Sequence, residues 1–541
     1  MLFNSYEFIF AFLPVTLAGF FLLGLRSRNL ALGWIVAASL AFYAWWRPIN
    51  VLIIAPSIIV NFVLARWLLR LTADEARAGL ARLVLLLGIA FNVAFLGYFK
   101  YVDFLATAAN DVIGTNFVLT QIVLPLGISF ITFQKIAFLI DVHGRRIPSF
   151  SLRDYCLFVL FFPQLIAGPI VHYREMMPQF QQARCRWDKE DIAVGLSLFV
   201  FGLFKKVVLA DGISEHVSPI YEMATAGSGV TLFPAWIAAI GFTLQIYFDF
   251  SGYSDMALGL ARFFGVRLPA NFDSPLKAAN IIDFWLRWHM TLTRFLTAYI
   301  YNPLVLWLTR RRMAKKLPGL GSREPSVAAF FQLLAGPVLL TMFVSGLWHG
   351  ASYLFILWGL LHGVYLTVNH AWRLFGPRLW RETHERFMRP AGLALTFLSV
   401  AVSMVLFRSA NAVAAKELLR GMVGLNGISL PQQIHAQLGP LKSLLQPFVF
   451  ASTNMSAQEF VLAMGWVGVL LLVALSFPNT LQLMARYEPA LGVHARPAAP
   501  QFLLRALDWT PTVPWALGMS SLVVAAVMRL GGKSEFLYWQ F

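Results

Sequence analysis

The sequence predicts an all-α protein that crosses a membrane many times, and two observations carry this prediction. Hydrophobic residues make up 58% of the 541 residues and charged residues only 13%, about half of the roughly 25% found in soluble domains. Apolar runs close to the roughly 20 residues that a bilayer-spanning helix needs also recur along the whole chain. From these runs we expect about 11–13 spanning or re-entrant helices.

The distribution of charge indicates a membrane topology and argues against a nucleic-acid partner. The chain has 43 Lys and Arg against 26 Asp and Glu, a net charge of +17. Its basic residues fall in short loops between apolar runs, which is the pattern of cytoplasmic loops in membrane proteins. The two cysteines, Cys156 and Cys185, have neither the number of a disulfide framework nor the spacing of a metal site.

In the first part of the chain, loop charge alternates between the two sides of the membrane. We expect residues 8–25 to form a retained span, because they lack the basic start and the small-residue cleavage site of a signal peptide. Loops expected on the cytoplasmic side are 26–29, 65–83 and 141–146, and those expected outside are 45–50 and 100–104. A further span is expected over 118–140, and the N-terminus is expected outside.

The segment YCLFVLFFPQLIAGPI, residues 155–170, breaks this alternation, because basic residues flank it on both sides. It contains Pro163 and Pro169, and proline interrupts the helical hydrogen-bond ladder. Broken backbone at membrane depth is tolerated where protein or a water-filled cavity covers it. We therefore expect a broken or re-entrant element that lines a cavity. The alternative is an ordinary helix kinked by proline.

The second part of the chain is expected to cross the membrane at least seven more times. The expected spans are 192–209, 232–250, 327–347, 353–368, 391–406, 461–477 and 514–528, with the C-terminus outside. Residues 250–300 mix apolar and ionisable residues and do not form a simple span. We find no internal repeat, so the inverted-repeat architecture of many transporters has no support in the sequence.

His349, in VSGLWHGASYLF (344–355), is the first candidate functional residue. A polar group buried without a partner costs roughly 2–7 kcal/mol, so this imidazole is either a satisfied packing residue or a proton carrier. The loop charges place it at a turn between two spans, in the outer half of the membrane. Gly350 and Ala351 are small enough to let a substrate or a backbone approach closely.

Two other apolar segments contain ionisable residues, which are functional candidates by default inside a membrane. In FWLRWHMTLTRF (284–295), Arg287 and Arg294 are expected on one helix face with Asp283, and His289 off that face. In IYFDFSGYSDMALG (246–259), Asp249 and Asp255 flank an expected Gly-Tyr turn. Their alternative role is structural, either pairing with Arg or capping a half-helix.

The remaining histidines are expected to be structural or solvated. His143 and His172 lie in basic loops. His362 follows His349 by thirteen residues, and on one continuous helix that spacing corresponds to about 20 Å. Nucleophile elbows, P-loops and metal-ligand motifs are absent from the sequence. A histidine acting as general base on an incoming hydroxyl group suits a chain without a nucleophile of its own.

Several segments together resemble the bacterial membrane-bound O-acyltransferases of the alginate O-acetyltransferase type. They are MLFNSYEFIFAFLP, LPLGISFITFQKIAFLIDVHG, FFPQLIAGPIVHYREMMPQF, the stretch LQIYFDFSGYSDMALGLARFFGVRLPANFDSPLKAANIIDFWLRWHMTLTRFLTAYIYNPL, VSGLWHGASYLFILWGLLHG and SEFLYWQF. They occur in order over essentially the whole chain. The pair FW-x-RWH and GLWHG is the most specific part. We thus expect one membrane-embedded domain, 1–541, with a motif-rich core at about 121–370 and an individual outer segment at 409–458.

The resemblance implies a fold, a reaction and two histidine roles. Helices of such proteins surround a thin centre with a tunnel, through which an acyl group passes from a cytoplasmic thioester to an outer acceptor. His349 matches the catalytic histidine of the family, and His289 matches the second histidine on the cytoplasmic side of the tunnel. We also expect the tunnel or the donor site to involve Trp348, Arg287, Trp288, Asn271, Asp273, Lys277, Arg294 and Asp249.

The resemblance also implies partners and a location. We expect acetyl-CoA or another acyl thioester as the donor substrate, with no bound cofactor and no metal. We expect the protein to lie among the lipids of the inner membrane of a Gram-negative bacterium. Its expected partner is a periplasmic acetyltransferase. The acceptor is an exopolysaccharide such as alginate or cellulose; peptidoglycan O-acetylation or D-alanyl transfer to teichoic acid are the alternatives. TAYIYNPL (297–304) lacks the Arg-Asp pair of many alginate-type members, which leaves polymer and partner open. A transporter or a non-catalytic export scaffold is the rival class.

Overall fold

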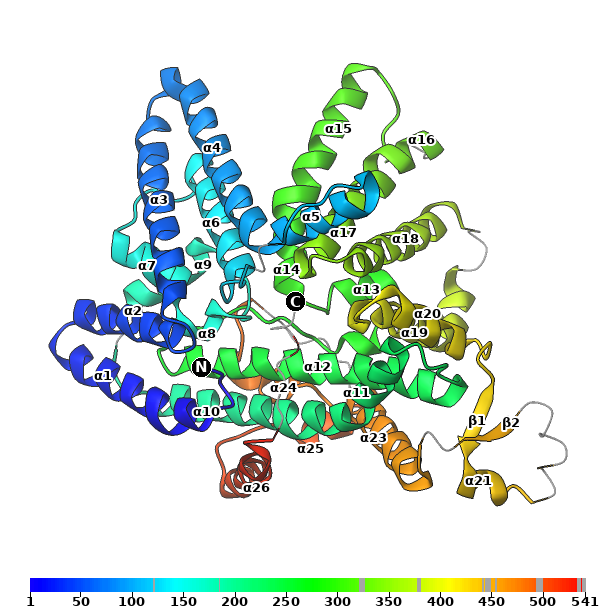
Figure 1. Cartoon of the computed structure of the whole chain (residues 1–541). Helices are drawn as coiled ribbons and strands as arrows, with labels where there is room; N and C mark the ends of the chain where they lie inside the picture. Colours follow the sequence, from blue (N-terminus) through cyan, green and yellow to red (C-terminus); the bar gives the residue numbers. More distant parts are fainter. Residues whose placement is uncertain are drawn as a thin grey trace.

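The computed structural model describes the chain except residues 120–121, 184, 321–325, 377–380, 440–441, 443–448, 453–454, 493–499, 533–536 and 538–541. The described part is almost entirely helical (Figure 1), apart from one small two-stranded sheet. The predicted all-α class is therefore confirmed. The tail motif at 534–541 apart from Leu537, and parts of the expected core and outer segment, lie outside the described residues.

The N-terminal helices form one side of the molecule. They are α1 (Leu13–Arg26), α2 (Arg28–Ala44), α3 (Ile49–Leu71), α4 (Ala78–Leu96), α5 (Val102–Ile113) and α6 (Ile128–His143). Two expectations for this region are wrong. The outer loop expected at 100–104 is helical, because a π-turn over Gly97–Tyr101 joins α4 to α5. The span expected from residue 118 begins at Ile128, directly after Gly127 with its left-handed φ of 67°.

Residues 152–182 form short helices separated by breaks, as the prolines predict. The helices are α7 (Leu152–Leu160), α8 (Phe162–Leu165) and α9 (Tyr173–Gln182). The backbone turns at Phe161, whose ψ of 109° lies outside the helical region. Ile166 and Ala167, after α8, line a cavity of about 490 Å³. The expectation of a broken element beside a cavity is thus confirmed.

Three long helices cross the middle of the molecule, where α10 and α12 lie side by side (Figure 1). They are α10 (Lys189–Phe204), α11 (Asp211–Thr225) and α12 (Leu232–Arg262). Glycines permit their close approach: a Cβ atom on Gly202 would overlap the carbonyl oxygen of Gly252. Because α12 is continuous, the Gly-Tyr turn expected between Asp249 and Asp255 is wrong, and neither aspartate caps a half-helix.

The following segment carries both candidate histidines. It comprises α13 (Ile281–Trp285), α14 (Met290–Leu296), α15 (Asn302–Ala314), α16 (Val327–Phe330), α17 (Gly336–His349) and α18 (Tyr353–Phe375). Helices α17 and α18 form a hairpin. A Cβ atom on Gly346 would overlap the carbonyl oxygen of Phe355, and one on Gly359 that of Met342. The two backbones therefore touch near the turn.

The C-terminal region covers one flank of α12. Its elements are α19 (Arg381–Arg408), α20 (Ala412–Met422), β1 (Ile428–Pro431), α21 (Gln432–Ala436), β2 (Val449–Ser452), α23 (Ala457–Ser476), α24 (Thr480–Leu483), α25 (Gln501–Ala506) and α26 (Val513–Arg529). In the expected outer segment, β1 and β2 pair in parallel with Ile428 opposite Val449. This sheet and α21 project from the helical body (Figure 1).

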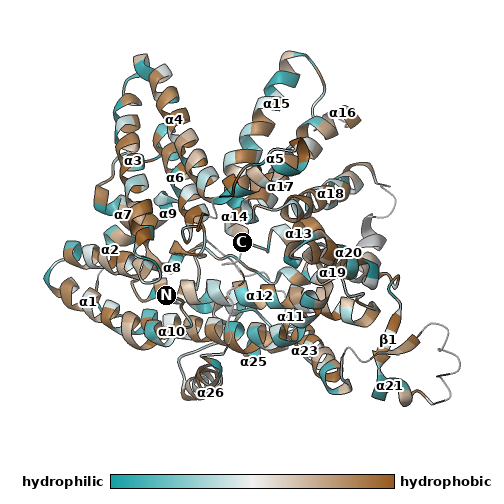
Figure 2. Ribbon diagram, viewed as in Figure 1, coloured by the Kyte–Doolittle hydropathy of each residue, from teal (hydrophilic) through white to brown (hydrophobic). Residues whose placement is uncertain are grey.

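Nine described helices are long and apolar enough to cross a membrane, and two shorter apolar ones are Arg28–Ala44 and Val513–Arg529. Apolar residues cover their outward faces (Figure 2), where side chains such as Leu86, Leu87 and Val93 are exposed. Water disfavours such a surface, whereas lipid chains accept it. The protein is a multi-pass membrane protein, as its composition predicts.

Candidate active site

His349 is the last residue of α17, at the turn that leads into α18, as the sequence predicts. The turn ends at Ser352, whose hydroxyl accepts a hydrogen bond from the Leu354 amide and caps α18. The side chain of His349 is buried among aromatic rings. Its ring centroid lies 4.9 Å from that of Trp348, 5.0 Å from Trp358 and 5.1 Å from Phe407.

Lys100 and Tyr101 hold the C-terminal end of α17. Lys100 Nζ donates hydrogen bonds to the carbonyl oxygens of Trp348 (2.5 Å) and His349 (3.2 Å). Tyr101 donates to the carbonyl oxygen of Leu347 (2.7 Å). The last carbonyls of a helix have no partner within the helix, and a cation at that end is favourable to the helix dipole. The backbone of His349 is therefore fixed from outside its own helix.

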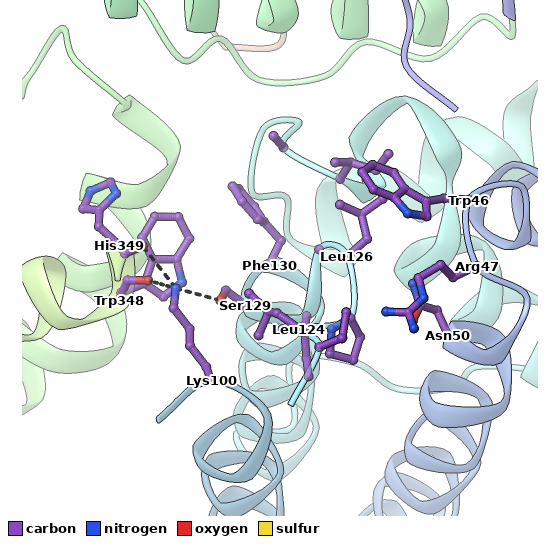
Figure 3. A pocket seen from close by; sticks show the side chains of 16 residues that line it. Trp46, Arg47, Asn50, Lys100, Leu124, Leu126, Ser129, Phe130, Trp348 and His349 are labelled. Carbon is purple, nitrogen blue, oxygen red and sulfur yellow. Dashed lines mark hydrogen bonds between the residues drawn. The ribbon is translucent and has the colours of Figure 1, made fainter. Parts of the chain in front are cut away.

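A cavity of about 490 Å³ ends at His349, a volume within the usual range for small-molecule sites, about 300–1,000 Å³. His349, Trp348 and Lys100 lie at one wall, and Trp46, Arg47 and Asn50 at the opposite wall (Figure 3). The space between them is bounded by the 123–130 segment and by Ile166 and Ala167. A molecule in this cavity reaches the catalytic candidate directly.

His289 lies in a break between α13 and α14, so the expectation that 284–295 is one helix is wrong. The residue has a left-handed φ of 42°. The break follows from hydrogen bonds to the segment before α13: Met290 N donates to the Asn271 carbonyl oxygen (2.9 Å), and Asp273 N donates to the Arg287 carbonyl oxygen (3.0 Å). These contacts divert backbone groups that a continuous helix would use.

Asn271 also organises the side chains around His289. Its Oδ1 accepts a hydrogen bond from Thr291 Oγ1 (2.6 Å) and lies 3.3 Å from His289 Nδ1. The ring of His289 is fully buried and meets Phe250 edge to face, with centroids 4.8 Å apart. Asn271 therefore fixes the orientation of the second histidine.

The side chain of Trp348 contacts the rings of both histidines, His349 and His289. The centroid of the Trp348 ring lies 4.9 Å from that of His349 and 5.8 Å from that of His289. Trp348 and His349 line the cavity, but His289 does not. In this conformation the cavity thus stops at Trp348, one side chain short of His289.

Four further predicted residues surround the same break. Arg287 forms an ion pair with Asp283 (2.9 Å), but it lies beyond the end of α13, so the helix face expected to hold Asp283, Arg287 and Arg294 does not form. Asp273 accepts a hydrogen bond from Asn479 (2.9 Å). Trp288 packs against neighbouring aromatic rings. Lys277 donates to the carbonyl oxygen of Phe477 (2.6 Å). Burial lowers the pKa of Lys277 to about 8, while Asp273 opposes this shift.

Arg294 belongs to a different group of side chains. Its guanidinium makes a bidentate ion pair with Glu175 (2.8 and 2.9 Å) and donates to the Ile170 carbonyl oxygen (3.2 Å). His172, expected to be solvated, instead lies 3.1 Å from the Tyr299 hydroxyl. Burial and the Arg294 charge lower the pKa of His172. This group connects the broken 152–182 segment to α14.

Asp249 lies apart from both histidines in a buried ion pair. Its carboxylate is 2.6 Å from Lys206 Nζ, which also pairs with Asp211 at 2.7 Å. Asp255 similarly pairs with Lys205 (2.6 Å). The partners expected for these aspartates were arginines, and the lysines come from the π-helical turn Lys205–Ala210 directly after α10. Asp249 lines none of the described cavities.

The expectation that His362 and His349 lie about 20 Å apart on one continuous helix is wrong. The two residues lie on opposite arms of the α17–α18 hairpin, and Trp358 contacts both rings, with the His362 centroid 4.9 Å away. Its nitrogens nevertheless have partners: Trp285 donates to Nδ1 (3.3 Å), and Nε2 lies 2.9 Å from Ser403 Oγ. These bonds agree with the predicted structural role.

Lys100, Tyr101 and Arg47 were not among the predicted site residues. A sequence signal for Lys100 exists, because it interrupts the aromatic run LGYFKYVDF, but its partners are about 250 residues away. Among the described residues, no group of three or more His, Cys, Asp or Glu could hold a metal ion. The arrangement offers one imidazole at the end of a cavity, which can take a proton from a bound hydroxyl group.

Comparison with known proteins connects this arrangement to acyl transfer. A sequence profile of the membrane-bound O-acyltransferase (MBOAT) family matches residues 144–317. The chain is 40% identical over 458 residues to a peptidoglycan O-acetyltransferase of Helicobacter pylori, covering 80% of this chain and 81% of that protein. It is 33% identical to a probable alginate O-acetylase of Pseudomonas aeruginosa, over 100% of both chains. A teichoic acid D-alanyltransferase of Streptococcus thermophilus is 26% identical over 52% of this chain and 68% of its own.

Proposed function

The chain belongs to the membrane-bound O-acyltransferase family and is an O-acyltransferase; on this premise we propose that it transfers an acetyl group from cytoplasmic acetyl-CoA to a hydroxyl acceptor outside the inner membrane. The acceptor is a bacterial surface glycan or a periplasmic acetyltransferase that passes the group on. The observation that carries this proposal is His349 at the end of a cavity of about 490 Å³. The predicted topology, with 45–50 and the turn after His349 outside, makes this cavity the acceptor side.

The proposed reaction uses His349 as the general base. The imidazole accepts the proton of the acceptor hydroxyl while that oxygen attacks the carbonyl carbon of the thioester. The carbon–oxygen bond forms, the carbon–sulfur bond breaks, and the coenzyme A thiolate takes the proton back from the imidazolium. Because thioesters are already activated, the protein needs no covalent nucleophile.

Lys100 is a positioning residue in this proposal. Its hydrogen bonds to the carbonyl oxygens of Trp348 and His349 keep the imidazole at the end of the cavity. We assign His289 to the donor side, because it contacts Trp348 from a place that the cavity does not reach. The donor path then requires the Trp348 ring to move. Arg287, Lys277 and Arg294 are candidates for contacts to the coenzyme on the cytoplasmic face.

Two polymers are the main candidates for the acceptor. Alginate-like exopolysaccharide is supported by end-to-end similarity to a probable alginate O-acetylase. Peptidoglycan is supported by the higher identity, 40%, to a peptidoglycan O-acetyltransferase. D-Alanyl transfer has weaker support, since the teichoic acid relative matches only half of the chain.

The test is reconstitution of the purified protein in proteoliposomes with radiolabelled acetyl-CoA. Separate samples receive an oligouronate, a muropeptide or a cellulose oligomer, with and without a periplasmic acetyltransferase. We expect coenzyme A release and label transfer with one of these acceptors. Absence of coenzyme A release in every sample, together with movement of an unmodified solute, would support a transporter and contradict the proposal.

A further inference from the structure

The wall of the cavity opposite His349 carries its own polar group. Trp46, Arg47 and Asn50 lie there, at the α2–α3 connection and the first turn of α3 (Figure 3). These three residues are called the Arg47 wall below. They come from a part of the chain that neither the family profile nor any predicted site residue covers.

Arg47 has no anionic partner in the described part of the chain. No Asp or Glu carboxylate there forms an ion pair with its guanidinium, and its side chain makes no hydrogen bond to a described residue. The residue is only half-exposed. A guanidinium withdrawn from water normally has a carboxylate, a phosphate or several carbonyl groups as partners. The cavity next to it is where such a partner can bind.

Asn50 provides a second, independent observation. It is 4% exposed and lines the same cavity, yet its side-chain amide makes no hydrogen bond to a described residue. Because Asn50 lines the cavity, its amide NH₂ can donate to a ligand oxygen there. The guanidinium of Arg47 and the amide NH₂ of Asn50 are donors, so they suit an acceptor-rich, negatively charged ligand.

The charge of the residues that line the cavity also favours a negatively charged ligand. The residues that line the cavity include Arg47 and Lys100 but no aspartate or glutamate. Lys100 is occupied by the carbonyl oxygens of the α17 end, which leaves Arg47 as the cation available to a ligand. An exposed aromatic ring, Trp46, flanks it at 49% exposure, and such a ring can pack against the apolar face of a sugar.

We propose that the Arg47 wall is a subsite for the oxyanion of an acidic saccharide, whose hydroxyl group faces His349 across the cavity. The proposal rests on the proposed function, because it assigns the acceptor. Arg47 pairs with the carboxylate or phosphate, and Asn50 donates to a further ligand oxygen. The anion and the reacting hydroxyl then bind at opposite walls, so the negative charge orients the sugar.

The experiment measures saccharide binding without any acyl donor, so that no reaction is needed for the readout. The full-length protein in nanodiscs of zwitterionic lipid is titrated by calorimetry with an oligouronate, a phosphorylated oligosaccharide and a neutral oligosaccharide of equal length. The variants are Arg47→Gln, Arg47→Lys and Asn50→Ala. The matched control is Arg77→Gln, which removes the same charge from the exposed loop at the far end of α3.

We expect Arg47→Gln to raise the Kd of the acidic saccharide about ten- to a hundredfold, the size of a charged hydrogen bond. Arg47→Lys should keep part of the affinity, and Asn50→Ala should weaken binding by a smaller factor. Arg77→Gln should bind the acidic saccharide with the same Kd as the wild type. The Kd values of the phosphorylated oligosaccharide and of the oligouronate, compared with each other, show which oxyanion the site prefers.

Three results would overturn the subsite. They are equal binding of neutral and acidic saccharides, equal affinity of Arg47→Gln and wild type, and displacement of every saccharide by anionic phospholipid in the nanodisc, which would assign Arg47 to a lipid headgroup. Failure of the proposed function looks different. In that case the acidic saccharide binds through Arg47, but no coenzyme A is released when acetyl-CoA is added.

Discussion

At the scale of single residues, His349 depends on contacts from far away in the chain. Lys100 precedes it by 249 positions and binds the carbonyl oxygens of both His349 and Trp348. These bonds join an ammonium group to the negative end of a helix dipole inside an apolar environment, where they are stronger than in water. The imidazole is consequently positioned through its backbone.

Lys100→Met tests this arrangement. We expect kcat to fall about a hundredfold, because a shift of about 1 Å in a reacting group can cost that much, with a smaller change in the KM for the donor. Lys135→Met is the control, since Lys135 is also buried and donates to Ser57 (2.9 Å) but does not line the cavity. It should lower stability without lowering the kcat of the folded fraction. Equal kcat values for both variants would contradict the role of Lys100.

Asn271 gives a second test at this scale. Asn271→Ala removes the acceptor of the Thr291 hydroxyl and the neighbour of His289 Nδ1, and leaves buried polar groups without partners at about 1–3 kcal/mol. We expect a lower unfolding temperature and a reoriented His289. Thermal unfolding in detergent measures the first, and donor KM the second. Unchanged values for both would show that Asn271 does not hold the histidine.

At the scale of elements, the α17–α18 hairpin sets the distance between His349 and Trp358. Its arms meet at Gly346 and Gly359, where backbone touches backbone. Small residues at such contacts are the usual means of close helix packing in membranes. Any side chain at these positions must separate the arms and move the rings around His349.

Gly359→Ala is therefore expected to lower both stability and kcat. A Cβ atom at this position would overlap the Met342 carbonyl oxygen, which cannot move without its helix. Gly465→Ala, in α23, is the matched control, because nothing lies within 4 Å of a Cβ atom there. Activity at saturating donor and thermal unfolding should separate the two variants. Equal behaviour of the two would contradict the close contact.

The sequence predicts the helical elements better than the contacts between them. The apolar runs predict the helical segments Phe8–Arg26 and Val327–His349 almost to their ends, and the loop charges correctly place His349 at a turn. The loop expected at 65–83 is largely helical instead, because α3 continues to Leu71 and α4 begins at Ala78. The break before His289 is missed, because hydrogen bonds to Asn271 and Asp273 produce it, and no local signal reports those partners. Lys100 is missed for the same reason: it resembles an interfacial lysine until its distant carbonyl partners are known.

At the scale of the whole molecule, buried ion pairs connect the central helices. Lys206 in the turn after α10 pairs with Asp249 in the middle of α12 and with Asp211 at the start of α11. Both Lys206 and Asp249 are almost completely buried. Asp249 lines none of the described cavities, which favours the structural pairing expected for it over a place in the tunnel.

Lys206→Met should destabilise the protein by about 3–5 kcal/mol, because it leaves the buried Asp249 carboxylate unpaired. Lys206→Met combined with Asp249→Leu should recover the part of that loss that comes from Asp249, since apolar residues can replace a buried pair, while Asp211 still lacks its lysine. The double variant should also retain acetyl transfer. Thermal unfolding and coenzyme A release test both statements. A double variant that is stable but inactive would show that Asp249 contributes to acetyl transfer.

The central claim is that His349 accepts the proton of a hydroxyl acceptor in the cavity. The most direct measurement is coenzyme A release by His349→Ala, compared with wild type, in proteoliposomes that contain acetyl-CoA and the acceptor found for the wild type. We expect the rate to fall at least about 10²–10⁴-fold, the usual contribution of a general base, with an unchanged unfolding temperature and unchanged acceptor binding. A His349→Ala protein that keeps more than about a tenth of the wild-type rate would contradict the claim.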